Sequence, residues 1–83
     1  MPLADNLRRA RLTRFWSQME LAEKADVSRA TIARIELGGY VPQLKTLRRL
    51  AEALGVEPAA LVTIEELEGE TAAGRVPAAA GSR

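Results

Sequence analysis

The stretch LAEKADVSRATIARIELGG, residues 21–39, contains two short amphipathic patterns that meet at a tight corner. Apolar side chains recur at helical spacing on both sides of the corner, with Leu21, Ala22 and Ala25 before it and Ile32 and Ile35 after it. Only residues 26–28 separate the two patterns. The sequence therefore predicts two helices joined by a turn of about three residues.

Residues around the corner are of the types that begin and end helices. The sequence SQME, residues 17–20, is a capping box, in which the side chains of Ser17 and Glu20 each accept from the other residue's backbone N–H. Ser28 is an N-cap residue type. The Gly38–Gly39 pair follows the second pattern, and glycine commonly ends helices because it tolerates a left-handed backbone.

The remaining chain is also predicted to be helical. Gly55 closes a run of leucines, and Pro58 suits the first turn of a further helix. The predicted helices span about 3–14, 17–25, 28–37, 44–54 and 58–62, with an extension of the last to residue 68 left open. From Gly69 onward little can be buried. We expect one all-α domain over residues 1–68 and a flexible tail over residues 69–83.

Composition limits the chemistry available to this domain. Its 83 residues include no cysteine and no histidine, which excludes disulfides, thiolate metal sites and the commonest general base. No apolar run is long enough for a signal peptide or a membrane span. The acidic run over residues 65–70 is interpreted as solvated. We expect a cytoplasmic protein that is not an enzyme and has no metal, cofactor, membrane contact or small-molecule site.

Charge is unevenly distributed along the chain. Residues 1–56 hold ten basic and six acidic side chains, whereas residues 57–83 hold two basic and five acidic ones. A basic body with an acidic end indicates a polyanionic partner for the body. An ordinary solvated surface explains the same distribution equally well.

Motifs over residues 16–61 resemble one family closely. The patterns SQ-x-x-LA, VS-x-x-T-I-x-R-I-E-x-G, a following proline and L-x-x-L-A-x-A-L-G-V occur in order. They resemble the Cro and phage-repressor type of helix-turn-helix domain, also called the xenobiotic-response-element family, over residues 3 to about 62. The resemblance implies a compact five-helix, lambda-repressor-like fold whose second and third helices form the helix-turn-helix.

The resemblance also implies which residues meet DNA. The N-terminal part of the third helix enters the major groove, and the base-reading candidates are Ser28, Arg29, Ala30, Thr31 and Arg34. Arg29 suits a bidentate bond to guanine, and Ala30 suits contact with a thymine methyl. A solvated helix face is the alternative for Arg29 and Arg34. The phosphate candidates are Ser17, Gln18, Tyr40, Gln43 and Lys45, and a capping role explains Ser17 equally well.

Further positions have structural roles in the family. Arg11 and Glu36 are expected to form a partly buried ion pair, since an unpaired buried carboxylate is costly. The chain departs from the family at two glycine positions, where it has Phe15 and Asp26. Aspartate tolerates positive φ, whereas an aromatic residue does so poorly, so the exit from the first helix is left open. Trp16 is expected in the core.

The resulting prediction is a sequence-specific, double-stranded DNA-binding transcriptional regulator, most simply a repressor, acting in the cytoplasm on the nucleoid. The alternative is an antitoxin or protein-interaction adaptor with the same fold. A homodimer reading an inverted-repeat operator is expected, because one helix-turn-helix discriminates poorly between sites. Its predicted contact is an apolar stripe on an extended fifth helix, formed by Leu61, Ile64 and Leu67. The alternative is that Leu61 closes the core while Ile64 and Leu67 are exposed to solvent.

Overall fold

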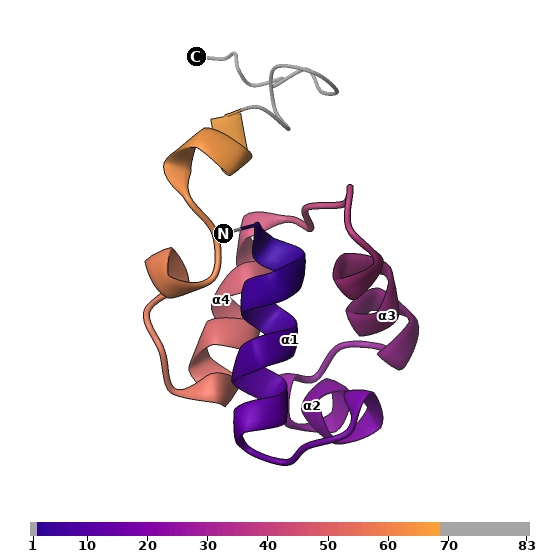
Figure 1. The fold of residues 1–83 in the computed structure, drawn as a ribbon. Helices are drawn as coiled ribbons and strands as arrows, with labels where there is room; N and C mark the ends of the chain where they lie inside the picture. Colours follow the sequence, from indigo (N-terminus) through magenta and orange to yellow (C-terminus); the bar gives the residue numbers. More distant parts are fainter. Residues whose placement is uncertain (1, 69–83) are drawn as a thin grey trace.

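The computed structural model describes residues 2–68, and within them every regular element is helical (Figure 1). The elements are α1 (Leu3–Thr13), α2 (Gln18–Ala25), α3 (Arg29–Leu37), α4 (Leu44–Leu54) and the 3₁₀-helix η1 (Pro58–Ala60). A further helical turn covers residues 64–68. The all-α fold is confirmed. The predicted tail, residues 69–83, lies outside the described residues.

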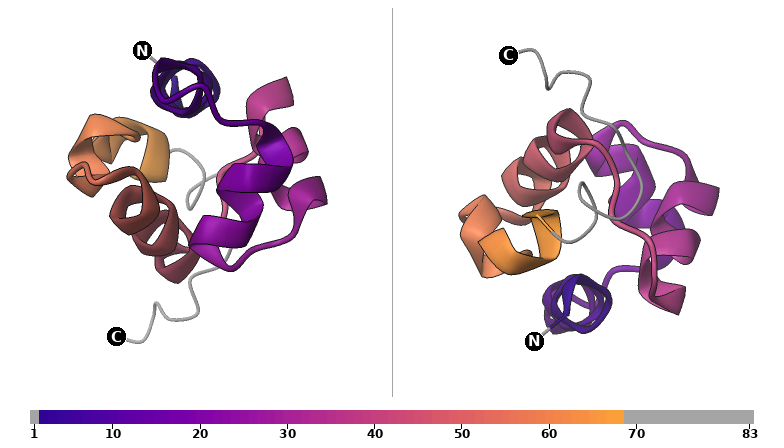
Figure 2. Two further views of the ribbon diagram at one scale, coloured as in Figure 1. Left: turned by 90° about the horizontal axis from the view of Figure 1, so that it is seen from below. Right: turned by 90° about the horizontal axis from the view of Figure 1, so that it is seen from above.

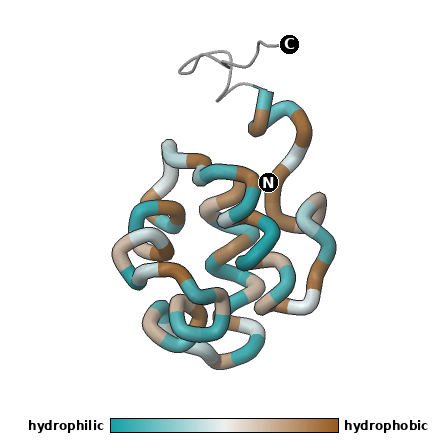
Figure 3. Tube along the Cα trace, turned by 180° about the vertical axis from the view of Figure 1, so that it is seen from behind, coloured by the Kyte–Doolittle hydropathy of each residue, from teal (hydrophilic) through white to brown (hydrophobic). Residues whose placement is uncertain are grey.

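One hydrophobic core joins the helices. Hydrophobic and hydrophilic positions alternate along each helix, as periodic burial requires (Figure 3). Viewed down α1, the other helices lie to one side of it, with α2 and α3 next to each other (Figure 2). The largest fully buried side chains are Leu3, Leu7, Leu21, Ile32, Ile35, Leu50 and Leu61. Because Ile32 and Ile35 belong to this core, it fixes the orientation of α3 relative to the other helices.

The predicted capping box at the start of α2 is present. The Ser17 Oγ accepts from the backbone N–H of Glu20 at 3.0 Å, and the Ser17 N–H donates to Glu20 Oε1 at 2.7 Å. These bonds satisfy two backbone donors that the helix itself leaves without partners. The start of α2 is thereby fixed at Gln18.

The corner between α2 and α3 is formed by Asp26, which has a left-handed backbone at φ 60°. The N–H of Val27 donates to the carbonyl of Ala22 at 3.0 Å and closes α2. Ser28 then caps α3 by accepting from the N–H of Thr31 at 3.1 Å. Two adjacent caps thus permit the short turn that the sequence predicts.

Phe15 has a left-handed backbone as well, with φ 59°. Its side chain is 92 % exposed, while the following Trp16 packs against the core as expected. The N–H of Trp16 donates to the carbonyl of Arg11 at 3.2 Å, which ends α1 in the way that a glycine normally would. The left-handed turn at Phe15 is followed directly by Trp16, which packs against the core.

Replacing Phe15 with glycine should raise the free energy of unfolding by about 1 kcal/mol, because it relieves the left-handed strain and sacrifices little burial. Phe15→Ala is the matched control, since alanine removes the ring but retains the strain. Urea denaturation followed by circular dichroism measures both variants. Equal stability of the glycine and alanine variants would contradict this account of Phe15.

The fifth helix, predicted over residues 58–62 with its extension to residue 68 left open, does not continue to residue 68 as one helix. The 3₁₀-helix η1 ends at Ala60, and Leu61, only 1 % exposed, lies in the core. A second capping box then restarts the helix, because Thr63 Oγ1 accepts from the N–H of Glu66 at 3.1 Å and Glu66 Oε1 accepts from the N–H of Thr63 at 3.2 Å. The chain therefore turns between Leu61 and the segment 64–68, and no single apolar stripe forms.

The prediction that the acidic run over residues 65–70 is solvated is wrong for Glu66, which is half-buried. Its Oε2 accepts from the backbone N–H of Leu3 at 2.8 Å, at the N-terminus of α1. A carboxylate is favourable there because the first N–H groups of a helix lack partners and the helix dipole is positive at that end. Asn6 Nδ2 donates to the carbonyl of Leu61 at 3.0 Å and ties the same two segments together.

Candidate nucleic-acid interface

The first turn of α3 presents its side chains to solvent. Ser28, Arg29 and Ala30 are exposed, and Thr31 is half-buried. The hydroxyl groups of Ser28 and Thr31 lie 2.8 Å apart, and Ser28 Oγ also caps the helix. Within this first turn, Arg29 and Ala30 are therefore the predicted base readers with no part in the helix cap. An arginine beside a small residue on an exposed helix start can enter a major groove.

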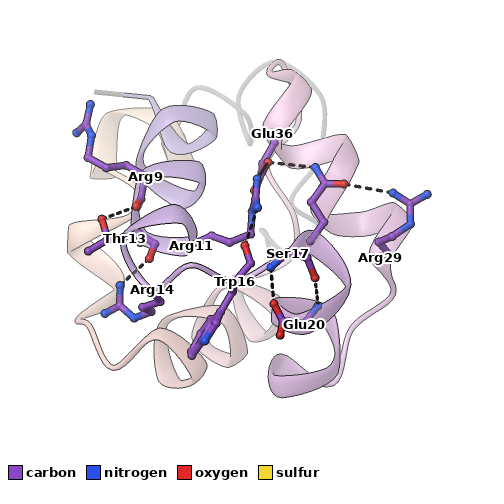
Figure 4. Close-up of polar contacts among 11 residues, drawn as sticks. Arg9, Arg11, Thr13, Arg14, Trp16, Ser17, Glu20, Arg29 and Glu36 are labelled. Carbon is purple, nitrogen blue, oxygen red and sulfur yellow. Dashed lines mark hydrogen bonds and ion pairs between the residues drawn. The ribbon is translucent and has the colours of Figure 1, made fainter.

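Gln18, the first residue of α2, lies beside Arg29, the first residue of α3. Arg29 Nη1 donates to Gln18 Oε1 at 3.2 Å (Figure 4). Gln18 Nε2 donates in turn to Glu36 Oε1 at 3.1 Å. The structure thus brings a phosphate candidate and a base-reading candidate into direct contact, which the sequence does not indicate.

The other end of the exposed surface holds Arg34 and Tyr40. The Arg34 guanidinium carbon lies 4.1 Å from the centre of the Tyr40 ring, within cation–π distance. Tyr40 itself is half-buried against the core. The ring therefore holds Arg34 toward the α3–α4 loop, away from the first turn of α3.

The remaining phosphate candidates lie at two helix N-termini. The Ser17 hydroxyl is used by the capping box of α2. Gln43 is the N-cap residue of α4, and its exposed side chain makes no capping hydrogen bond. Lys45 is exposed in the first turn of the same helix. Backbone N–H groups at a helix N-terminus favour phosphate, and these side chains add donors around them.

The predicted ion pair between Arg11 and Glu36 is present and bidentate. Arg11 Nε donates to Glu36 Oε2 at 2.7 Å and Nη2 donates to Oε1 at 2.8 Å, with side-chain exposures of 10 % and 6 %. Arg11 Nη1 donates to the carbonyl of Trp16 at 2.9 Å. The hydrogen bonds that Arg11 donates to Glu36 raise the pKa of Arg11 despite the opposing effect of burial. The pair joins α1 to the C-terminal half of α3.

The predicted dimer residues do not form one surface. Leu61 is buried, Leu67 is half-buried against the core, and Ile64 is 64 % exposed. Across residues 2–68, no group of three or more histidine, cysteine, aspartate or glutamate side chains could hold a metal ion. None of the helices in this part of the chain is long and apolar enough to cross a membrane.

Comparison with known proteins agrees with this geometry. The family model described as helix-turn-helix matches residues 7–61. The immunity repressor protein of Bacillus phage phi105 is 40 % identical over 67 residues, which cover 81 % of this chain and 46 % of the repressor. An uncharacterized HTH-type transcriptional regulator of Methanothermobacter thermautotrophicus is 49 % identical over 41 residues, 49 % of this chain and 59 % of that protein.

The chain thus spans about half the length of these curated relatives. The family match runs from the middle of α1 through η1 and includes both helices of the corner. It also includes Arg29 and the Arg11–Glu36 ion pair. The chain belongs to the helix-turn-helix family, of the Cro and phage-repressor type that its motifs indicate.

Proposed function

We propose that this chain is a sequence-specific, double-stranded DNA-binding transcriptional regulator that represses transcription by occupying promoter DNA. The observation that carries the proposal is the exposed first turn of α3, with Arg29 held beside the N-terminus of α2. The names of the two relatives, an immunity repressor and a transcriptional regulator, support it. Such a protein acts in the cytoplasm, on the DNA of the nucleoid.

In this proposal α3 lies in the major groove and reads bases. Arg29 donates to O6 and N7 of a guanine, and Ala30 contacts a thymine methyl. Thr31 and the capping residue Ser28 border the same bases. Arg34, held over Tyr40 at 4.1 Å, meets the edge of the site or the adjacent backbone.

Phosphate contacts surround this reading helix and position the domain without reading sequence. Gln18 and Ser17 supply donors at the N-terminus of α2, and Gln43 and Lys45 supply them at the N-terminus of α4. The Tyr40 hydroxyl is a further donor to the backbone. One phosphate group at each helix start would fix the angle of α3 in the groove.

Arg29→Ala should weaken binding to the cognate site by about 1–3 kcal/mol and relax the preference at one base pair, because a bidentate arginine–guanine contact is lost. Selection of bound fragments from random DNA, followed by titration of the selected duplex, measures both effects. Lys45→Ala is the control, and it should weaken binding to all sequences by similar factors. An unchanged consensus after Arg29→Ala would refute the base-reading role.

We further propose that two chains bind an inverted repeat as a homodimer. Recognition helices of such dimers enter successive major grooves roughly 34 Å apart, so a contact must hold the two domains together. Ile64 is the member of the predicted contact set that remains exposed, at 64 %. It lies on the segment 64–68, which Glu66 anchors to α1.

Ile64→Glu should abolish dimerisation on DNA, because it places a charge in a small apolar contact. Sedimentation velocity of the protein with an inverted-repeat duplex should show two chains per duplex for the wild type and one for the variant. Leu12→Glu, which changes an exposed apolar residue of α1, should leave two chains. One chain per duplex in the wild type would disprove the dimer.

A further inference from the structure

Four side chains form a continuous series of hydrogen bonds from the domain interior to the exposed start of α3. Arg11 Nη2 donates to Glu36 Oε1 at 2.8 Å, and Gln18 Nε2 donates to the same oxygen at 3.1 Å. Arg29 Nη1 then donates to Gln18 Oε1 at 3.2 Å (Figure 4). The series begins in the ion pair between α1 and α3 and ends at the proposed base reader.

The chemistry of the neighbours permits only one orientation of the Gln18 amide. The Glu36 carboxylate accepts hydrogen bonds and the Arg29 guanidinium only donates them. If the amide were rotated by half a turn, its oxygen would face the carboxylate and its NH₂ group would face the guanidinium. Glu36 is held by two bonds from Arg11 and its side chain is 6 % exposed, so it is the fixed member that sets the amide.

We infer that Glu36 is a specificity-determining positioning residue of the DNA-binding surface. Its buried carboxylate orients the Gln18 amide, whose carbonyl oxygen restrains Arg29 for contact with its base. The inference rests on the proposed function, in which Arg29 reads that base. It gives the Arg11–Glu36 ion pair a role in recognition in addition to its role in folding.

Restraint of Arg29 before binding affects affinity for the correct base. Arginine is among the side chains that lose most rotamer freedom when they are immobilised. A hydrogen bond that limits this freedom in the free protein lowers the ordering cost on DNA. The Gln18 NH₂ group retains a second N–H for a phosphate oxygen, so the same amide links backbone contact to base reading.

The test compares two variants that interrupt the series at different points. Gln18→Met removes the amide, and the double variant Arg11→Met/Glu36→Leu replaces the buried pair with apolar side chains without leaving an unpaired charge. The Arg29→Ala variant identifies the base pair that Arg29 reads, as the one at which the variant shows no preference. Selection from random DNA then measures the preference of the other two variants at that base pair. Nitrogen relaxation of the Arg29 Nε group in the free protein measures the restraint directly.

Both variants should lose most of the about 5- to 150-fold discrimination that a bidentate arginine–guanine contact supplies, and Arg29 should become more mobile. Glu52→Ala is the matched control, because it removes an exposed carboxylate of α4 that lies outside the series. It should leave the base preference and the Arg29 mobility unchanged.

Two outcomes would overturn the inference, and they differ in what they say of the proposed function. If Arg29→Ala removes a preference that both interrupting variants retain, Arg29 reads DNA without the help of Glu36, and the proposed function stands. If Arg29→Ala leaves the consensus unchanged, the base-reading role fails and the inference fails with it.

Discussion

Glu36→Ala should lower the free energy of unfolding by about 3–5 kcal/mol, because it leaves the Arg11 guanidinium buried without its carboxylate. The Arg11 side chain is only 10 % exposed, so water cannot replace the two hydrogen bonds that Glu36 accepts from it. Gln18 Nε2 loses its acceptor in the same variant. Native domains are stable by only about 5–15 kcal/mol, so this loss should remove between about a fifth and all of the stability of the domain.

Urea denaturation followed by circular dichroism measures this effect. Glu52→Ala, which removes an exposed carboxylate from α4, is the matched control and should change stability by less than about 0.5 kcal/mol. Arg11→Met/Glu36→Leu should retain most of the wild-type stability, since no charge is left unpaired. A Glu36→Ala variant as stable as the Glu52→Ala control would show that the ion pair is energetically unimportant.

Local sequence signals account for the parts of the fold that were predicted correctly. The capping box of Ser17 and Glu20 involves residues three apart, and the corner at Asp26 depends on the residues next to it. Helical periodicity placed Leu21 and Ile32 in the core. Family resemblance, rather than local pattern, supplied the Arg11–Glu36 pair, whose members are 25 positions apart.

The predictions that failed depend partly on distant residues and partly on a local signal that was overlooked, the capping box TIEE of residues 63–66. The apolar spacing of Leu61, Ile64 and Leu67 is compatible with one helix, but burial of Leu61 and the cap at Thr63 break it. The bond from Leu3 N–H to Glu66 spans 63 positions, and no local pattern indicates it.

The orientations of the side chains in the candidate site could not be predicted from the sequence either. Gln18 and Arg29 were assigned to different tasks, phosphate contact and base reading, and nothing in their spacing indicates that they touch. Arg34 was placed with the base readers because it lies on the same helix face, yet its guanidinium stacks on Tyr40. The motif predicts a set of residues for the site, whereas the contacts among them required the packed structure.

Raising the salt concentration from 50 to 200 mM should weaken binding to the operator by roughly 10²-fold, if each of two protomers neutralises about two phosphates with Lys45 and Arg34. The slope of log K against log salt would then be about −4, and a monomer with the same contacts would give about half that value and lose only about 12-fold. The salt series therefore reports on the phosphate contacts and on the number of bound chains together. Titration of a labelled duplex at each salt concentration provides the data.

Two variants at the start of α4 separate charged from neutral phosphate contacts. Lys45→Ala removes a cation and should reduce the magnitude of the slope by about one unit for each protomer. Gln43→Ala removes a neutral donor, so it should lower the affinity by a similar factor at every salt concentration and leave the slope unchanged. Because both side chains are exposed and neither makes a capping bond in α4, neither change should disturb the fold. A slope near zero in the wild type would mean that no cationic side chain neutralises a phosphate, and the phosphate contact proposed for Lys45 at the start of α4 would then be wrong.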